Sequence, residues 1–295
     1  MRKTFSSDKP IFLIFGLPRS GTTLIYQYIV HRLHVSYFTN SVGKYPYSPC
    51  VITYLQHKLY GDYKSDFQSN YGKVRGKAAP REAGSFWGRA FGFDDYIKFS
   101  DVSQRDVNLL RHTVACVQSL FGNLSFVNKN VKHILRIDAL KSIFPNFIFV
   151  VVNRDICDVA LSVIRGRYKQ LTNPHEWWSA KPSNYQSIKD LSIHEQVAHQ
   201  LISLKGKMLD DLSIIGSKSI LSVNYAAFCN DPESLIKQVL NLDNSLRFKN
   251  QPVERFKPQY LQSQNEEERQ LLEVVALESK KQNSRVRAGC PASLS

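Results

Sequence analysis

The sequence lacks long apolar runs and has no Cys-x-x-Cys pair. Its longest apolar runs, Ile11–Phe15 and Phe147–Val152, are far too short to cross a bilayer. The five cysteines in this chain of 295 residues are scattered and odd in number. This pattern argues against a zinc cluster and does not indicate a disulfide framework. We find no targeting segment near the start of the chain, and we expect a cytoplasmic protein without a membrane span.

Acidic residues are scarce. The chain has 25 Asp and Glu against 39 Lys and Arg, which gives a net charge of +14. Such an excess attracts a polyanion, and composition leaves three kinds open: nucleic acid, an anionic membrane surface, or a phosphorylated or sulfated ligand. Apolar residues at 43% and charged residues at 22% are typical of a globular protein and exclude a wholly disordered or fibrous chain.

Short apolar runs typical of buried strands alternate with amphipathic helical patterns along the chain. Strands are predicted at Ile11–Phe15, before Asn128, at Phe147–Val152 and at Ile220–Val223. Helices are predicted to follow them, including Lys132–Ile143 and His194–Ile215. The alternation predicts an α/β fold, with a P-loop-like central parallel β-sheet flanked by helices. We expect a single domain over residues 1–282 and a mobile basic tail over residues 283–295.

A loop able to bind an oxyanion follows the first predicted strand. Its sequence is Gly16-Leu-Pro-Arg-Ser-Gly-Thr-Thr23, and a helix follows it. Such a loop turns backbone N–H groups inward at the positive end of a helix. It offers one cation and three hydroxyl groups, from Arg19, Ser20, Thr22 and Thr23. Thr22 stands where the nucleotide-binding motif G-x-x-x-x-G-K-[ST] has its lysine, which argues against ATP or GTP hydrolysis.

A second candidate anion site follows the strand Phe147–Val152. Arg154 lies at its carboxyl end, and Ser162 lies on the polar face of the next predicted helix. Alone, such a pair is an ordinary feature of a solvated helix. Carboxyl ends of parallel strands meet at one edge of a sheet, where ligands bind. Two anion sites there suggest a ligand with phosphates at both ends of a ribose.

Several segments resemble sulfotransferases that use 3′-phosphoadenosine 5′-phosphosulfate, including tyrosylprotein, carbohydrate and bacterial members. Residues 11–24 resemble the loop that binds the 5′-phosphosulfate, and the resemblance implies this role for Arg19, Ser20, Gly21, Thr22 and Thr23. Residues 150–162 resemble the segment that binds the 3′-phosphate, which implies this role for Arg154 and Ser162. Ser222–Tyr225, followed by Asp231-Pro232, resembles the strand and helix whose Tyr lies near the cofactor.

The resemblance implies transfer of a sulfuryl group to a hydroxyl, less readily an amine, of a glycan or small-molecule acceptor. Adenosine 3′,5′-bisphosphate would be the other product, and no metal is expected. Two other functions stay open: a P-loop kinase, and a non-catalytic nucleic-acid-binding protein with aromatic residues such as Trp177, Trp178 and Tyr185 among basic ones. We expect no nucleic-acid partner, and the sequence leaves the oligomeric state open.

The reaction needs a cation near the leaving oxygen and a base for the acceptor proton. Asn128-Lys129-Asn130 resembles a segment of tyrosylprotein sulfotransferases, and Lys129 is the candidate cation. Val35–Pro49, where many relatives place an acidic base, contains no acid. We therefore predict Glu82 as the general base, with neighbouring Phe86 and Trp87 partly desolvating it. Glu82 could instead pair with Arg81 or Arg89 or cap a helix, and His133 is the alternative base.

Overall fold

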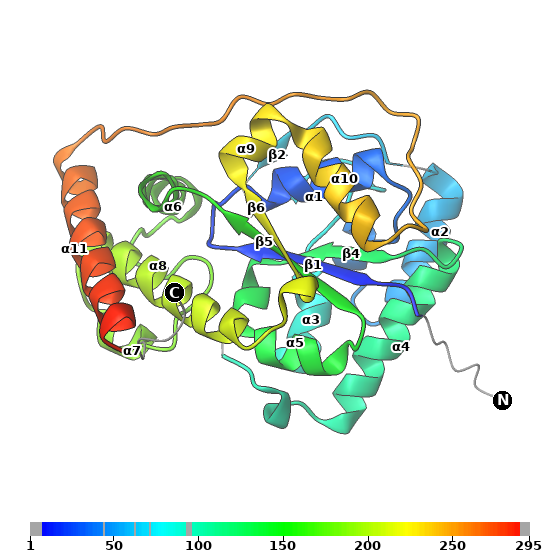
Figure 1. The fold of residues 1–295 in the computed structure, drawn as a ribbon, viewed down its shortest axis with the longest axis horizontal. Helices are drawn as coiled ribbons and strands as arrows, with labels where there is room; N and C mark the ends of the chain where they lie inside the picture. The colour runs from blue at the N-terminus through cyan, green and yellow to red at the C-terminus, as the bar shows by residue number, and fades with distance from the viewer. Residues whose placement is uncertain (1–7, 44, 62, 71, 93–95, 290–295) are drawn as a thin grey trace.

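The computed structural model describes residues 8–43, 45–61, 63–70, 72–92 and 96–289, and a parallel sheet lies at its centre (Figure 1). The sheet has four strands in the order β4-β1-β5-β6. Their bounds are Ile11–Gly16 for β1, Phe126–Lys129 for β4, Phe147–Asn153 for β5 and Ile220–Asn224 for β6. All neighbouring strands pair in parallel, which confirms the predicted α/β class.

Helices cover both faces of the sheet. One face packs against α3 (Gly84–Phe91), α4 (Gln104–Leu120), α5 (Ile137–Ile143), α6 (Ile156–Gln170) and α8 (Ile193–Ser213). The other packs against α1 (Thr22–Arg32), α9 (Tyr225–Asn230) and α10 (Pro232–Leu242), as Figure 1 shows. Successive β1 side chains alternate between the two cores: Leu13 packs in the first and Ile14 in the second. A strand buried on both faces is apolar throughout, which is why β1 could be predicted from sequence.

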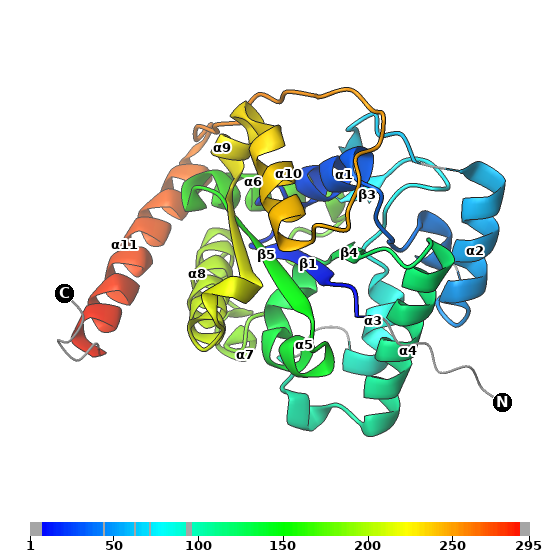
Figure 2. The same cartoon turned by 45° about the vertical axis from the view of Figure 1, so that its right-hand side comes forward.

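The chain between α1 and α4 forms short elements beyond β4. Ser36 pairs with Phe126, so this segment extends the edge of the sheet. After a 3₁₀ turn at Asn40–Gly43 come α2 (Pro49–Tyr60) and a hairpin of β2 (Ser69–Asn70) and β3 (Lys73–Val74). Figures 1 and 2 both show α2 at the periphery of the molecule. The short α7 (Tyr185–Ile188) precedes α8.

The predicted helix Lys132–Ile143 is wrong as a single element. A 3₁₀ turn, Val131–Leu135, is followed by the separate α5, and Arg136 between them has φ −136° and ψ 17°. The buried guanidinium of Arg136 donates to the carbonyl of Gly92 at 2.9 Å. A tertiary contact of this kind overrides a local helical pattern.

Part of the predicted mobile tail over residues 283–295 lies in a helix, and its mobility stays a prediction. Helix α11 runs from Glu266 to Gly289, so the first part of that segment is helical; residues 290–295 lie outside the described residues. Leu271 and Val275 of α11 pack in the first core, and Glu268 forms an ion pair with Arg165 of α6 at 2.7 Å. No helix in the described part of the chain is long and apolar enough to span a membrane.

Candidate active site

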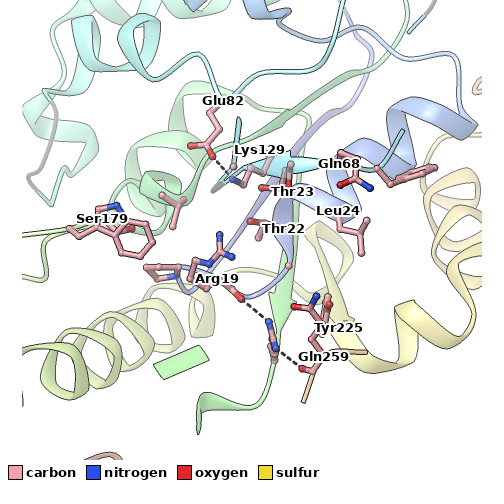
Figure 3. Close-up of a pocket in the computed structure, with 18 residues that line it drawn as sticks. Arg19, Thr22, Thr23, Leu24, Gln68, Glu82, Lys129, Ser179, Tyr225 and Gln259 are labelled. Carbon is pink, nitrogen blue, oxygen red and sulfur yellow. Dashed lines mark hydrogen bonds and ion pairs between the residues drawn. The ribbon is translucent and has the colours of Figure 1, made fainter. Parts of the chain in front are cut away.

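The ends of all four strands of the central sheet converge on one cavity of about 380 Å³ (Figure 3). Arg19 follows β1, Lys129 ends β4, Arg154 follows β5 and Tyr225 follows β6, and all of them line the cavity. Each of these residues was expected at a strand's carboxyl end. The parallel topology brings them together, as ligand sites in open α/β sheets require.

The loop after β1 has the shape of an anion cradle. Arg19 and Gly21 both have positive φ, 69° and 97°, and Gly21 precedes the first residue of α1. A Cβ at Gly21 would lie 2.3 Å from Cδ2 of Tyr225, so a larger residue does not fit. Because the N-cap residue Gly21 has no side chain, no side chain caps the first backbone N–H groups of α1. Thr22 and Thr23, the first two residues of α1, line the cavity. The positive helix end there suits an oxyanion.

Ser20 does not reach the main cavity. It is 1% exposed, its hydroxyl has no hydrogen-bond partner in the described residues, and the residue lines a smaller adjoining cavity of about 110 Å³. Arg154 lines both cavities, and Lys205 of α8 lines the smaller one. No pattern in the sequence pointed to Lys205, because it lies on a helix far along the chain.

The guanidinium of Arg154 is held between two backbone carbonyls. It donates to the carbonyl of Arg19 at 3.2 Å and to that of Gln259 at 2.5 Å (Figure 3). It also lies 4.7 Å from the ring centroid of Tyr225, a cation–π distance, and 3.9 Å from the carboxylate of Asp158. Burial is the main cause that raises the pKa of Tyr225 to about 12, so its hydroxyl stays neutral.

Ser162 contacts Arg19 of the loop after β1, and its predicted role in binding the 3′-phosphate stays a prediction. Its hydroxyl accepts a hydrogen bond from Nε of Arg19 at 3.1 Å, and Ser162 lies outside the residues that line either cavity. The structure therefore brings Ser162 to Arg19 and the loop after β1. Arg19 in turn links Ser162 to Arg154 through its own carbonyl.

Glu82 and Lys129 meet on the opposite side of the cavity from Tyr225 (Figure 3). Nζ of Lys129 donates to Oε1 of Glu82, and the side chains of Lys129 and Glu82 are 6% and 31% exposed. Gly72 lies over the pair, since a Cβ there would be 3.0 Å from Oε1 of Glu82 and 3.6 Å from Nζ of Lys129. The two residues predicted for catalysis are thus brought together as an ion pair that solvent reaches through Glu82.

Asn128 and Asn130, on either side of Lys129, hold the backbone that carries Glu82. The side-chain amide of Asn128 donates to the carbonyl of Arg81 at 3.1 Å, and that of Asn130 to the carbonyl of Glu82 at 3.3 Å. The triplet of residues 128–130 therefore fixes where Glu82 lies relative to Lys129. The triplet stands out in the sequence, but this role of its asparagines does not.

The aromatic neighbours of Glu82 and the alternative base lie in the core. Phe86 and Trp87 are both 0% exposed, and Trp87 donates to Oδ1 of Asn128 at 3.0 Å. His133 is also 0% exposed, with Nε2 3.2 Å from the same oxygen. Burial, with Arg136 and Lys129 nearby, holds the pKa of His133 well below its usual range. His133 does not line the cavity.

The wall between these two sides includes residues that the sequence did not identify as site residues. Trp178, Ser179, Phe67, Gln68 and Gln259 line it. Ser179 and Phe67 have positive φ, 74° and 53°, which L residues rarely adopt and which often occurs at functional sites. In the sequence, Trp178 is notable only as an aromatic residue in a basic region.

Hydrogen bonds from helix α8 hold the loop that carries Trp178 and Ser179. The buried side-chain amide of Gln200, on α8, donates to the carbonyls of Trp178 and Ala180 at 3.0 and 2.7 Å. These two bonds flank Ser179 and hold it in its unusual conformation. Within the described residues, no group of three His, Cys, Asp or Glu side chains is placed to bind a metal ion.

Comparisons with known proteins agree with this architecture. The structure is similar to sulfotransferase STF1 from Mycobacterium tuberculosis H37Rv, with a TM-score of 0.52, 13% identity, and coverage of 95% of this chain and 77% of that one. It is also similar to sulfotransferase STF9 from Mycobacterium avium, with a TM-score of 0.53, 13% identity, and coverage of 92% and 69%. At these identities the likeness shows the fold alone.

Among curated proteins, none matches this sequence. A family model described as the sulfotransferase family matches residues 10–243, which include the loop after β1, Lys129, Arg154 and Tyr225. This match covers most of the chain, and the observed fold agrees with it. The chain therefore belongs to the sulfotransferase family and is a sulfotransferase.

Proposed function

We propose that this sulfotransferase moves a sulfuryl group from 3′-phosphoadenosine 5′-phosphosulfate to an acceptor. The acceptor group is a hydroxyl, less readily an amine, of a glycan or small molecule. The observation that carries this proposal is the convergence of an anion cradle, a second arginine and a Lys–Glu pair on one cavity of about 380 Å³. Ligand pockets of small molecules have volumes of about 300–1,000 Å³, so a nucleotide is an appropriate size.

The residues present fit the 5′ end of the donor. The start of α1 lies at the cavity wall, where backbone amides at a helix N-terminus suit an anionic group, and the hydroxyls of Thr22 and Thr23 add donors. Arg19, at the cavity wall, adds a positive charge.

Arg154 is proposed to bind the 3′-phosphate, together with Ser162. In the structure its Nη2 donates to the carbonyl of Gln259, a neutral acceptor. A phosphate oxygen would replace that carbonyl with a stronger, charge-assisted acceptor. Ser162 accepts a hydrogen bond from Arg19, and the carbonyl of Arg19 accepts one from Arg154, so the loop after β1 links Ser162 to Arg154.

Lys129 and Glu82 are proposed to act on the reacting groups. The donor, when bound, supplies a good leaving group, so positioning and charge stabilisation provide most of the catalysis. Lys129 stabilises the negative charge that develops on the leaving oxygen. Its ion pair uses Oε1 of Glu82, which leaves Oε2 to accept the proton of the acceptor hydroxyl.

The two alternative functions have less support. A kinase would need a lysine where Thr22 stands. For nucleic-acid binding, Trp178 would have to stack on bases, but it lines the cavity, and Trp177 packs against Tyr185 with ring centroids 4.8 Å apart. Neither aromatic arrangement resembles an exposed stacking platform.

Calorimetric titration separates the three functions. Purified protein is titrated with adenosine 3′,5′-bisphosphate, with ATP and magnesium, and with a short oligonucleotide. We expect the bisphosphate to bind most tightly, since it alone offers both phosphates to the loops after β1 and β5. A preference for ATP with magnesium would favour a kinase, and a preference for the oligonucleotide would favour nucleic-acid binding; either result would contradict the proposal.

A further inference from the structure

Helix α2 exposes apolar side chains to solvent and buries polar ones. Val51, Leu55 and Leu59 are 58%, 46% and 71% exposed, whereas Thr53 and Gln56 on the opposite face are 0% and 3% exposed. Residues at positions i, i+4 and i+8 share one side of a helix, so the exposed apolar residues form a stripe. A surface helix of a globular protein normally buries such a stripe.

The orientation of α2 is fixed by its inward contacts. Ile52 and Cys50 pack against the first core, and the Cys50 thiol contacts the carbonyl of Thr113 at 3.8 Å. Thr39 donates to the buried side-chain carbonyl of Gln56. Rotating the helix to bury Leu59 would break these contacts. The packing of α2 therefore keeps the apolar stripe exposed.

The stripe belongs to a larger exposed surface, which we call the α2 face. It consists of Tyr45, Tyr47, Val51, Tyr54, Leu55, Leu59 and Tyr60. These are seven of the fifteen exposed large hydrophobic residues in the described chain, gathered within residues 45–60. Scattered exposed apolar residues need no explanation, but a contiguous group marks an interaction surface.

Three cations contact tyrosines of the α2 face. The Lys58 ammonium lies 5.8 Å from the ring centroid of Tyr54, and the Arg89 guanidinium lies 4.2 Å from that of Tyr47. Lys77 donates to the hydroxyl of Tyr60 at 2.7 Å. Residues 45–77 contain five Lys and Arg against two Asp. The face therefore combines an apolar centre with a positively charged rim.

We propose that the α2 face docks onto an anionic lipid surface. Leucine and valine side chains enter the boundary of the acyl chains, tyrosines lie at the headgroup level, and lysines and arginines contact lipid phosphates. Tyrosine beside a cation suits this boundary, where one end of the side chain is apolar and the other wet. The residues of this face do not line the donor cavity, so the proposal is independent of the donor.

Vesicle co-sedimentation of the purified full chain tests this proposal. Vesicles of phosphatidylcholine mixed with phosphatidylglycerol are compared with vesicles of phosphatidylcholine alone. We expect binding to the anionic vesicles and weaker binding as salt is raised, because salt screens the cations. The variant Leu55→Gln/Leu59→Gln should bind about tenfold more weakly, equal to about 1.4 kcal/mol. The variant Leu209→Gln/Ile214→Gln changes exposed apolar residues of similar exposure elsewhere and should bind normally.

Three results would overturn the proposal. Wild-type protein that binds neither kind of vesicle would remove the lipid surface as the partner. Equal loss in the α2 variant and the Leu209/Ile214 variant would show a general effect of exposed apolar residues. Concentration-dependent self-association that the α2 variant abolishes, with no vesicle binding, would assign the face to a second copy of this chain. Light scattering measures that association, and circular dichroism confirms that both variants fold.

Discussion

Replacing Gly21 by alanine tests whether the contact between the loop after β1 and Tyr225 keeps Arg154 in place. Gly21 has φ 97°, and its Cβ would lie 2.3 Å from the Tyr225 ring. The left-handed backbone costs an L residue about 1–2 kcal/mol, and displacing a packed ring costs a further 1–3 kcal/mol or so. We therefore expect Gly21→Ala to destabilise the protein by about 2–5 kcal/mol, or roughly 2 °C of Tm for each kcal/mol.

Gly122→Ala is the matched control. Gly122 has φ 80°, but a Cβ at this position would have no atom of the described residues within 4 Å, so the substitution carries the backbone cost without the collision. Because the displaced Tyr225 ring lies 4.7 Å from the Arg154 guanidinium, Gly21→Ala should also weaken binding of adenosine 3′,5′-bisphosphate. Thermal unfolding and calorimetry measure both effects.

Comparing the two glycine variants can refute the role of the contact between Gly21 and Tyr225. Equal losses of stability in Gly21→Ala and Gly122→Ala would show that the Tyr225 contact has no energetic weight. A double-mutant cycle with Tyr225→Ala checks the same point, since removing the ring should relieve part of the Gly21→Ala cost. Strictly additive effects would contradict contact between these residues.

Three further predictions concern charged groups. Glu82→Gln should lower turnover on the order of 100-fold in a steady-state assay while adenosine 3′,5′-bisphosphate binds normally; near-normal turnover would place the base elsewhere. Arg154→Ala should weaken a nucleotide with a 3′-phosphate by roughly 1.5–3 kcal/mol and spare one without it; calorimetry showing equal weakening of both would remove the 3′ assignment. The hydrogen bond and ion pair with Arg32, at 2.8 Å, hold the pKa of Glu233 below its ordinary 4.5. The Glu233–Arg32 pair therefore contributes fully to the free energy of unfolding above pH 4.5, and this contribution is lost as the pH falls below that value. Acid unfolding followed by fluorescence should therefore show a smaller loss of stability over this range for Glu233→Gln than for wild type, and equal losses would count against the pair.

Local patterns predicted the strands and the places of the loops that follow β1 and β5. β1 and β5 are apolar on both faces, and the loop after β1 carries its glycines and hydroxyls within eight residues. Helix α11 was missed because most of its residues are charged or polar and only a few, such as Leu271 and Val275, pack in the core. Its apolar signal was too weak to distinguish it from a solvated segment.

Contacts between distant segments could not be predicted. The ion pair of Glu82 with Lys129 joins residues 47 positions apart and depends on Asn128 and Asn130 holding the backbone of residues 81 and 82. The carbonyl of Gln259 reaches Arg154 from a segment with no regular secondary structure. Side-chain geometry of this kind follows from tertiary packing and has no periodic signal.

The proposed activity itself is tested by following transfer of a radiolabelled sulfuryl group from donor to acceptor. Purified wild-type protein is incubated with labelled 3′-phosphoadenosine 5′-phosphosulfate and fractionated glycan and small-molecule acceptors. We expect label in an acceptor fraction, release of adenosine 3′,5′-bisphosphate in equal amount, and strong loss of both with Lys129→Ala. Arg105→Ala, at an exposed arginine on α4, is the control and should retain activity. Undiminished transfer by Lys129→Ala would show that Lys129 is not the catalytic cation. If wild-type protein binds the bisphosphate but transfers no label to any acceptor fraction, the proposed sulfuryl transfer from this donor is wrong.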